Sequence, residues 1–396
     1  MVSVVRIDVE SKVIMDAVSK SGRSLEEVRE RYKSFDKWIN AELNPTLNQL
    51  KDLSSYLRVP FGYLLLKTPA EEHLPLLEFR TIDTDSIQSP SRELVDTIHD
   101  MERKQNWLRN TLIEEGKERL NFVGIFDRNK NISHLEMAKK IRDIIGLNKK
   151  WFEDANSQVS TFSILRDKLS QNGIVVMQNG IALSNTRRAL DIKEFRAFTL
   201  VDEYAPLIFI NNKDSNSGKT FSILHELAHI FFGRDSLYND DYKQRNKYRS
   251  SIEVICNKLA GEIIAPTDIF ISGWTKLYKH LKNDNEKISS LADDFKVSKL
   301  VVARKALEQG YINQNKYNEI ADISQYEFEL NQKREKRSDG GGHPVNNALS
   351  RLDINFLRTL ISSTEYGETQ YTDAYRIAGV GRGVFEDLTD RLNGVR

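Results

Sequence analysis

The pentapeptide His225-Glu226-x-x-His229 lies inside the apolar run from Ile223 to Gly233 and restricts the fold and chemistry of this chain more than any other feature. Residues four apart on a helix share one face, so both imidazoles can reach a single Zn²⁺ ion. Glu226 then points toward the open coordination position, where a water molecule would be activated. The motif predicts a buried helix that carries metal-assisted hydrolysis.

Chance does not readily explain this motif. With 7 histidines and 57 acidic residues among 396 positions, a random arrangement would contain about 0.02 such matches. The flanking residues are apolar nearly all round, as in a helix inside a domain, and Gly233 is a natural helix stop. The alternative is a pair of core histidines bonded to backbone, which would require three polar groups to find partners by accident.

A catalytic zinc site needs a third protein ligand, and a helix predicted over residues 248–266 supplies the candidates. Glu253 is the favoured ligand. Glu262 is the rival, but it lies more than two turns later, so a metal ion aligned with Glu253 would not meet it. Cys256, the only cysteine, could bind zinc as a thiolate, but its apolar neighbours favour a small core residue.

Three segments together resemble the ImmA/IrrE family of metallopeptidases. They are residues 198–212, residues 220–229, and Glu253-x-x-Cys-Asn257 with the following Ala260 and Pro266. The resemblance implies an α+β zincin-like metallopeptidase domain with His225, His229 and Glu253 as zinc ligands. It also implies that Glu226 is the general base and that the substrate is a protein such as a transcriptional repressor.

Two positions depart from the pattern of that family. Cys256 stands where alanine is usual, and Ala265 stands where methionine is usual. Both residues are apolar, so the expected chemistry is unchanged. Zn²⁺ would lower the pKa of a bound water toward 7, and Glu226 would accept its proton and deliver it to the leaving amine.

Other residues near the motif have open roles. Tyr238, Tyr204 and Arg196 are candidates for stabilising an oxyanion only because they are close in the sequence. Residues 206–212 read as a strand, which is either a core strand or an exposed edge that holds an extended peptide.

The N-terminus predicts a different kind of domain. Residues 10–68 read as five short helices, near 9–19, 24–30, 34–42, 47–56 and a tail from Pro60. The run 35–50 with the apolar residues that follow resembles the Xre (Cro/repressor-like) helix-turn-helix.

DNA contacts of this unit would come from Lys33 and Lys37. However, residues 1–70 contain 11 basic and 9 acidic residues, and the expected recognition helix also carries Asp36 and Glu42. That helix could therefore dock on a protein instead.

The complete chain is expected to be multidomain and mainly α-helical. A linker and a bridging helix are expected over 71–130, the peptidase domain over 131–330, a linker rich in glycine and charge over 331–345, and a helical module over 346–396. Within the peptidase domain we expect helices near 132–146 and 157–171 and strands near 173–177 and 196–200. Residues 288–312 form a helix pair that closes this domain or, as the less favoured alternative, binds DNA.

The C-terminal module resembles the extension of longer family members, some of which are encoded beside toxin genes. Residues 352–361, 371–378 and 384–392 are expected to be helices. The module fits a docking site for a partner protein, and equally a dimerisation arm or a structural cap.

Composition narrows the class of function. The net charge of +1 argues against a general polyanion binder, and a single cysteine excludes an internal disulfide framework and favours the cytoplasm. No apolar run is long enough for a membrane helix, and no signal peptide is evident.

The sequence therefore predicts a cytoplasmic, zinc-dependent endopeptidase and regulator in a phage, mobile-element or toxin–antitoxin setting. Its expected partner is a protein substrate (a repressor or toxin-like protein). Operator DNA and a second copy of the chain, in a homodimer, are candidate partners, and the sequence does not determine the oligomeric state. The alternative is a non-catalytic DNA-binding antitoxin or transcriptional regulator that uses the zincin fold as a scaffold. Only the enzyme requires an open fourth metal position and a cleft for an extended chain.

Overall fold

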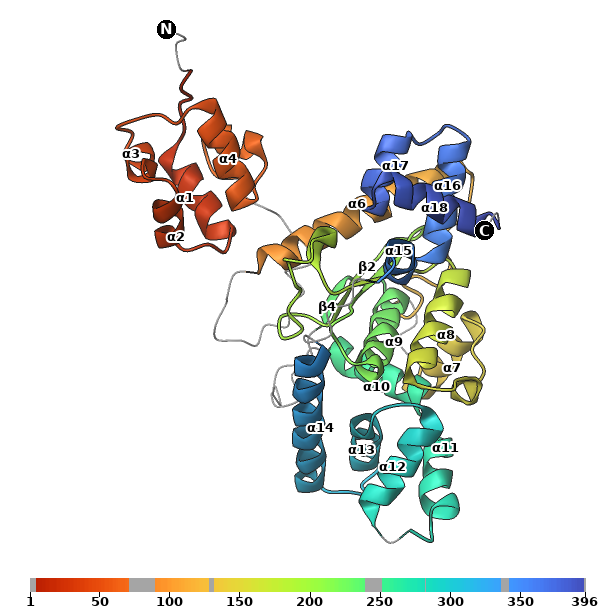
Figure 1. Ribbon diagram of the computed structural model, residues 1–396. Helices are drawn as coiled ribbons and strands as arrows, with labels where there is room; N and C mark the ends of the chain where they lie inside the picture. The colour runs from red at the N-terminus through yellow and green to blue at the C-terminus, as the bar shows by residue number, and fades with distance from the viewer. Residues whose placement is uncertain are drawn as a thin grey trace. The chain divides into compact units, whose positions relative to one another are not determined.

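The computed structural model describes residues 5–70, 90–127, 132–238, 251–281, 283–335 and 342–394 (Figure 1). The chain forms two compact units. The first comprises Met1–Pro75 and Thr84–Ile98, and the second comprises Leu76–Asp83 and His99–Arg396. The linkers expected from the sequence lie largely outside the described residues.

The N-terminal unit is built from short helices around an apolar core. Two of them begin at capping boxes, where Ser24 pairs with Glu27 and Thr46 pairs with Gln49. The elements are α1 (Ser11–Lys20), α2 (Leu25–Arg31), α3 (Phe35–Ile39), α4 (Leu47–Leu57) and the 3-10 helix η1 (Phe61–Leu65).

The five helices expected from the sequence in this unit are confirmed, but the third is shorter than expected. It ends at Ile39 rather than at residue 42. Ala41 adopts a left-handed backbone conformation with φ of 58°, which cannot continue a right-handed helix. Phe35 and Trp38 anchor α3 in the core.

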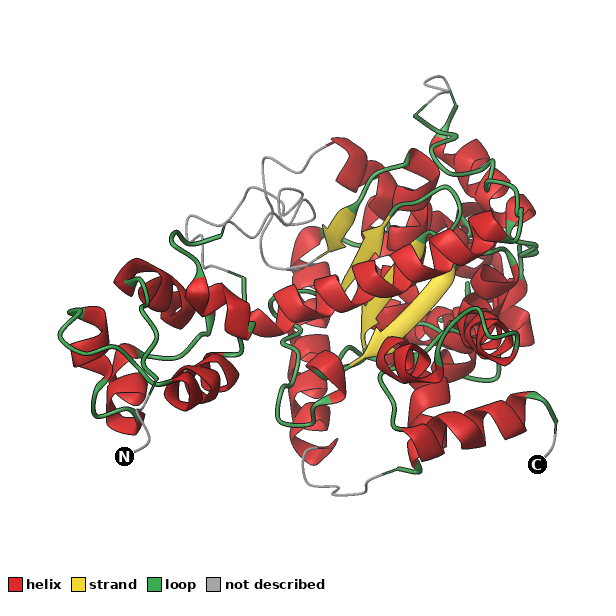
Figure 2. Cartoon of the chain, turned by 90° about the horizontal axis from the view of Figure 1, so that it is seen from above, coloured by secondary structure: helices red, strands yellow, loops and turns green. Residues whose placement is uncertain are grey.

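The second unit contains a small mixed sheet between helices (Figure 2). Its strand order is β1-β3-β2-β4, with β1 parallel to β3 and the other pairs antiparallel. The strands are β1 (Val175–Asn179), β2 (Ala197–Leu200), β3 (Leu207–Asn211) and β4 (Ser236–Tyr238).

The position of β3 decides between the two readings of residues 206–212. This strand pairs on both sides, and all of its residues are buried. It is therefore a core strand, and its alternative interpretation as a substrate-binding edge is wrong. The strand β4 was not predicted, because three residues are too short for a period-2 pattern to be recognised.

The helix α9 (Asn216–Phe232) packs on β2, β3 and β4 and carries the histidine motif. The side chain of Ser215 caps its first turn by accepting a hydrogen bond from the Gly218 amide. Asp214 lies against the same turn and pairs with Arg196 of the sheet at 2.7 Å. Gly233 ends the helix in a left-handed conformation, with φ of 69°, that favours glycine.

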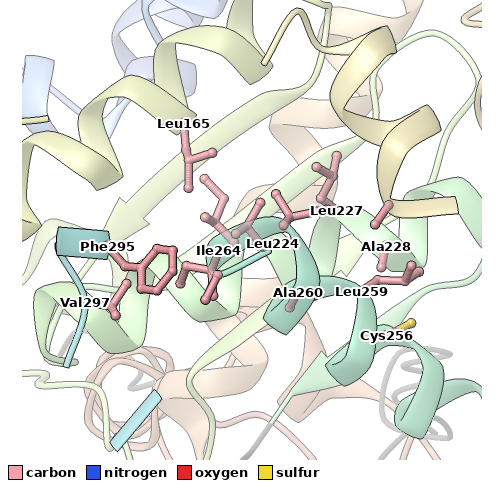
Figure 3. Packing of buried hydrophobic residues seen from close by; sticks show 14 of the residues in the cluster. Leu165, Leu224, Leu227, Ala228, Cys256, Leu259, Ala260, Ile264, Phe295 and Val297 are labelled. Carbon is pink, nitrogen blue, oxygen red and sulfur yellow. The ribbon is translucent and has the colours of Figure 1, made fainter. Parts of the chain in front are cut away.

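The helix α10 (Ser251–Ile264) packs along α9. Figure 3 shows Leu259 and Ala260 of α10 close to Leu224 and Leu227 of α9, within the main core cluster. Because the two helices are joined by this apolar interface, polar side chains at its edge are held at fixed separations.

Further helices complete the second unit. Residues of α6 from His99 onward run beside the sheet, where Gln105 donates to the carbonyls of Leu200 and Ala205. The helices before the sheet are α6 (Arg92–Glu114), α7 (His134–Ile144), η2 (Trp151–Asp154) and α8 (Gln158–Gln171), and η3 (Ala182–Ser184) follows β1. After α10 come α11 (Thr267–Ser272), η4 (Gly273–Leu277), α12 (Asp284–Phe295), α13 (Lys299–Glu308) and α14 (Gln314–Glu335).

The C-terminal segment belongs to the second unit. It contains α15 (Pro344–Arg351), α16 (Ile354–Glu365), α17 (Tyr371–Ala378) and α18 (Arg382–Leu392). The buried carboxylate of Asp353 accepts hydrogen bonds from the Ser170 hydroxyl at 2.9 Å and from the Val176 amide at 3.2 Å. Arg166 donates to the carbonyls of Ser350 and Leu352. These bonds join the segment to α8 and β1.

Candidate metal centre

The helix α9 presents three polar side chains in an otherwise apolar stretch. His225 and Glu226 are 0% exposed, and His229 is 2% exposed. The two imidazoles lie on one face of the helix because they are four residues apart. Burial of three ionisable groups is unfavourable unless each has a partner, so the partners define the site.

Glu253 from the first turn of α10 completes a group of three ligand atoms. The Nε2 atoms of His225 and His229 lie 3.2 Å apart, and each lies 3.2 Å from a carboxylate oxygen of Glu253. Nitrogen ligands sit about 2.0–2.1 Å from a tetrahedral zinc ion, which places neighbouring ligand atoms about 3.3 Å from one another. The two histidines contact different oxygens of Glu253, and each of the three printed distances is close to the spacing expected around zinc.

Asn257 sets the orientation of the first imidazole. Its Oδ1 lies 3.1 Å from Nδ1 of His225. An amide oxygen can only accept a hydrogen bond, so Nδ1 carries the proton and donates. In this neutral tautomer Nε2 has a lone pair directed at the other ligand atoms. This tautomer is the one that can bind a metal ion through Nε2.

The charges of the group also suit a cation. Burial alone would raise the pKa of Glu253, but its contacts with His225 and His229 hold that pKa well below its usual range. The carboxylate is therefore ionised at neutral pH. Two imidazole nitrogens and one carboxylate would form a donor set of the kind that holds catalytic zinc.

Glu226 lies beside this group without being part of it. Burial raises the pKa of its carboxyl group to about 7, although the neighbouring His229 and the Thr199 hydroxyl lower it. Thr199 Oγ1 donates to Oε2 at 2.5 Å, and Ser236 Oγ donates to Oε1 at 3.4 Å. A carboxyl group with a pKa near neutrality can both accept and release a proton.

The other two ligand candidates are Glu262 and Cys256. Glu262 pairs with Lys305 at 2.8 Å and accepts hydrogen bonds from the amide and hydroxyl groups of Thr267. Cys256 is buried among core residues (Figure 3) and also contacts His229. Burial raises the pKa of its thiol, although the contact with His229 lowers it. Neither belongs to the metal-binding group found among the described residues.

Of the three oxyanion candidates, only Tyr238 lies next to the group. Its ring centroid is 4.1 Å from that of His225. Tyr204 instead accepts a hydrogen bond from Arg119, and Arg196 pairs with Asp214 at the start of α9. The three residues were chosen because they are close to the motif in the sequence. One of them lies beside the site in the structure, and the other two have other contacts.

Thr199 and Ser236 were not anticipated as residues of this site. The sequence contains one available signal, since Thr199 is a polar residue between two apolar ones in a buried strand. Ser236 offered no signal because β4 itself was not predicted. Asn257 was noted as part of the family pattern, but its contact with His225 depends on the packing of α10 against α9.

The basic residues predicted for DNA contact lie in the N-terminal unit. Lys33 and Lys37 are both exposed, the first just before α3 and the second within it. Asp36 of the same helix pairs with Arg29 at 2.9 Å. The surface of α3 therefore carries charges of both signs.

Comparison with known proteins supports the nature of the second unit. No helix in the described part of the chain combines the length and the apolar character needed to cross a membrane. No match was found among curated proteins or among solved structures. Residues 170–307, which contain all the residues of the candidate metal centre, match the model of a peptidase family described as the IrrE N-terminal-like domain, and this match supports the resemblance to the ImmA/IrrE metallopeptidases.

Proposed function

We propose that this protein is a zinc-dependent endopeptidase that hydrolyses a peptide bond in a protein partner. The observation that carries the proposal is the convergence of His225, His229 and Glu253, whose ligand atoms all lie within 4.8 Å of one another, next to the buried carboxylate of Glu226. The peptidase family match over the same segment supports it.

In the proposed reaction the three metal ligands and Glu226 have different roles. His225, His229 and Glu253 would hold the zinc ion. When bound, this ion supplies Lewis acidity to a water molecule and to the scissile carbonyl group. Glu226 takes the proton from the attacking water on its carboxylate and gives it to the nitrogen of the leaving amine, which is favourable because its pKa is about 7.

An edge strand near the site supports a peptide substrate. Among the strands that the structure describes, β4 lies at one end of the sheet, and it carries Tyr238 against His225. An extended peptide can add to such an edge through backbone hydrogen bonds, which are independent of side chains. Specificity would then come from neighbouring side chains.

We further propose a regulatory setting for this activity. The substrate would be a transcriptional repressor or a toxin-like partner of a phage, mobile element or toxin–antitoxin system, as in the resemblance to the ImmA/IrrE family. The N-terminal unit would bind operator DNA through Lys33 and Lys37, which are exposed at and just before α3.

The test of the peptidase activity compares the wild type with Glu226→Gln. Both proteins are loaded with zinc, the metal content is measured, and each is incubated with a library of proteome-derived peptides whose new termini are read by mass spectrometry. We expect new termini with the wild type only and equal zinc in both proteins, because an amide cannot accept the proton from water.

A matched control variant tests whether a loss of cleavage comes from a loss of folding. Glu262→Gln alters a buried glutamate of the same unit that lies outside the metal-binding group, so it should retain cleavage in folded protein. Zinc-loaded wild type that produces no new termini from the library, or Glu226→Gln that cuts as fast as the wild type, would contradict the proposed function.

A further inference from the structure

Two hydroxyl groups from neighbouring strands contact the carboxylate of Glu226, although neither belongs to the histidine motif. Thr199 reaches Oε2 at 2.5 Å, and Ser236 reaches Oε1 at 3.4 Å. Thr199 is 0% exposed and Ser236 is 3% exposed. Each carboxylate oxygen therefore accepts a hydrogen bond from a different strand inside the core.

The pairing of β2 with β4 brings the two hydroxyl groups together. Thr199 and Ser236 are direct partners in this antiparallel pair. Residues directly opposite each other project from the same face of a sheet, and here that face is covered by α9. Thr199 and Ser236, hereafter the hydroxyl pair, are thus directed at one point on the helix.

Bonds at both ends of this strand pair fix its register. The Arg196 amide donates to the Tyr238 carbonyl at 2.9 Å, and the Val201 amide donates to Asp235 Oδ1 at 2.5 Å. A slip of β4 by one residue would turn the Ser236 hydroxyl to the opposite face of the sheet, away from α9. The pairing of the two strands therefore sets the position of the hydroxyl pair.

Glu226 needs such partners for two physical reasons. A buried carboxylate is strongly unfavourable unless donors replace its water. A glutamate side chain also has several rotatable bonds, and holding it in one orientation costs conformational entropy. Donors on both oxygens offset the first cost and restrict the carboxylate to one plane.

We propose that Thr199 and Ser236 are positioning residues that hold the carboxylate of Glu226 in the orientation from which it accepts a proton from water at the His225, His229 and Glu253 site. Thr199 makes the shorter contact and has the larger effect. This proposal rests on the proposed peptidase function, because it assigns the hydroxyl pair a role in proton transfer rather than in folding alone.

The first test uses metal-free protein and does not depend on activity. Urea denaturation is measured for Thr199→Val in the wild type and in a Glu226→Leu background. We expect Thr199→Val to lower the midpoint more where the carboxylate is present, because in Glu226→Leu the hydroxyl keeps only its 3.4 Å contact with the backbone carbonyl of residue 226. The control Thr161→Val changes another buried threonine, whose hydroxyl donates to the Gln158 carbonyl at 2.8 Å, and should lower the midpoint equally in both backgrounds.

The second test measures kcat and KM of zinc-loaded variants on the peptide that the wild type cuts fastest in the library. We expect Thr199→Val to lower kcat about 10–100-fold, as for other residues that orient a metal site, with KM and zinc content unchanged. Thr199→Ser keeps the hydroxyl and should restore most of the activity. Ser236→Ala should have a smaller effect.

The outcomes separate this proposal from the proposed function. Equal shifts of the urea midpoint in both backgrounds, or no rescue by Thr199→Ser, would overturn the positioning role even in an active peptidase. A coupling between Thr199 and Glu226 in metal-free protein, with no cleavage by any variant, would instead overturn the peptidase function and leave the hydroxyl pair with a structural contact only.

Discussion

The side-chain oxygen of Asn257 lies 3.1 Å from Nδ1 of His225, so a residue of α10 fixes the tautomer of a histidine on α9. This contact ties the chemistry of the candidate metal centre to the packing of two helices. Asn257 holds the candidate ligand His225 in place without itself contacting the metal position. Metal-binding histidines usually have such a partner on their second ring nitrogen.

Replacing Asn257 should weaken zinc binding without removing a ligand. Asn257→Leu leaves Nδ1 of His225 without its acceptor, so the imidazole loses its preferred tautomer, and we expect zinc affinity to fall about 10–100-fold. Competition with a chromophoric chelator measures this change. The control Asn257→Asp keeps an acceptor at the same position, and an equal loss of affinity in both variants would contradict the tautomer argument.

The identity of the third ligand is tested by metal stoichiometry. We expect His225→Ala, His229→Ala and Glu253→Ala each to lower the zinc bound after dialysis, because two ligands do not hold the ion as three do. Glu262→Ala should retain zinc, since its carboxylate pairs with Lys305. Normal stoichiometry in Glu253→Ala would move the third ligand to Glu262 or Cys256.

The ion pair between Glu262 and Lys305 should matter for stability. Both side chains are buried, with exposed fractions of 8% and 7%. Lys305→Met leaves a buried carboxylate without its counter-ion and should lower the free energy of unfolding by about 3 kcal/mol in urea titrations. The control Lys149→Met breaks an exposed pair with Asp268 and should cost no more than about 1 kcal/mol. Similar losses of unfolding free energy in both variants would show that the buried ion pair contributes no more to stability than the exposed pair.

Asp353 should be required for the stability of the second unit. Its carboxylate accepts bonds from Ser170 and Val176 and caps α16 through the Phe356 amide. Asp353→Ala leaves these donors unsatisfied, so we expect a loss of about 2–4 kcal/mol on unfolding in urea. Asp293→Ala, at an exposed position, is the control and should change stability little. An unchanged midpoint in Asp353→Ala would mean that the hydrogen bonds of this carboxylate do not contribute to the stability of the unit.

DNA binding by the N-terminal unit is tested by the salt dependence of operator affinity. If Lys33 and Lys37 contact phosphates, operator affinity should fall steeply with salt, and the double change Lys33→Gln, Lys37→Gln should flatten the dependence of log Kd on log salt by about two units. Fluorescence anisotropy at several salt concentrations measures this slope. Equal binding by a fragment that lacks residues 1–70 would disprove a role for this unit.

The local pattern of the sequence was sufficient for features that depend on neighbours along the chain. The helical spacing of His225 and His229 determines that both imidazoles share a face, and Gly233 marks the end of that helix. The helices predicted near 24–30 and 47–56 likewise agree with the structure, where capping boxes at Ser24 and Thr46 begin α2 and α4. Such features are predictable because their hydrogen bonds join residues only a few positions apart.

Tertiary packing decided everything that joins distant residues. The contact of Asn257 with His225 exists because apolar residues join α10 to α9, and the contacts of Thr199 and Ser236 with Glu226 exist because β4 pairs with β2. The sequence alone named the histidines and the carboxylates but could not orient them, because hydrogen-bond partners far apart in the chain are chosen by the packing of whole elements and not by local periodicity.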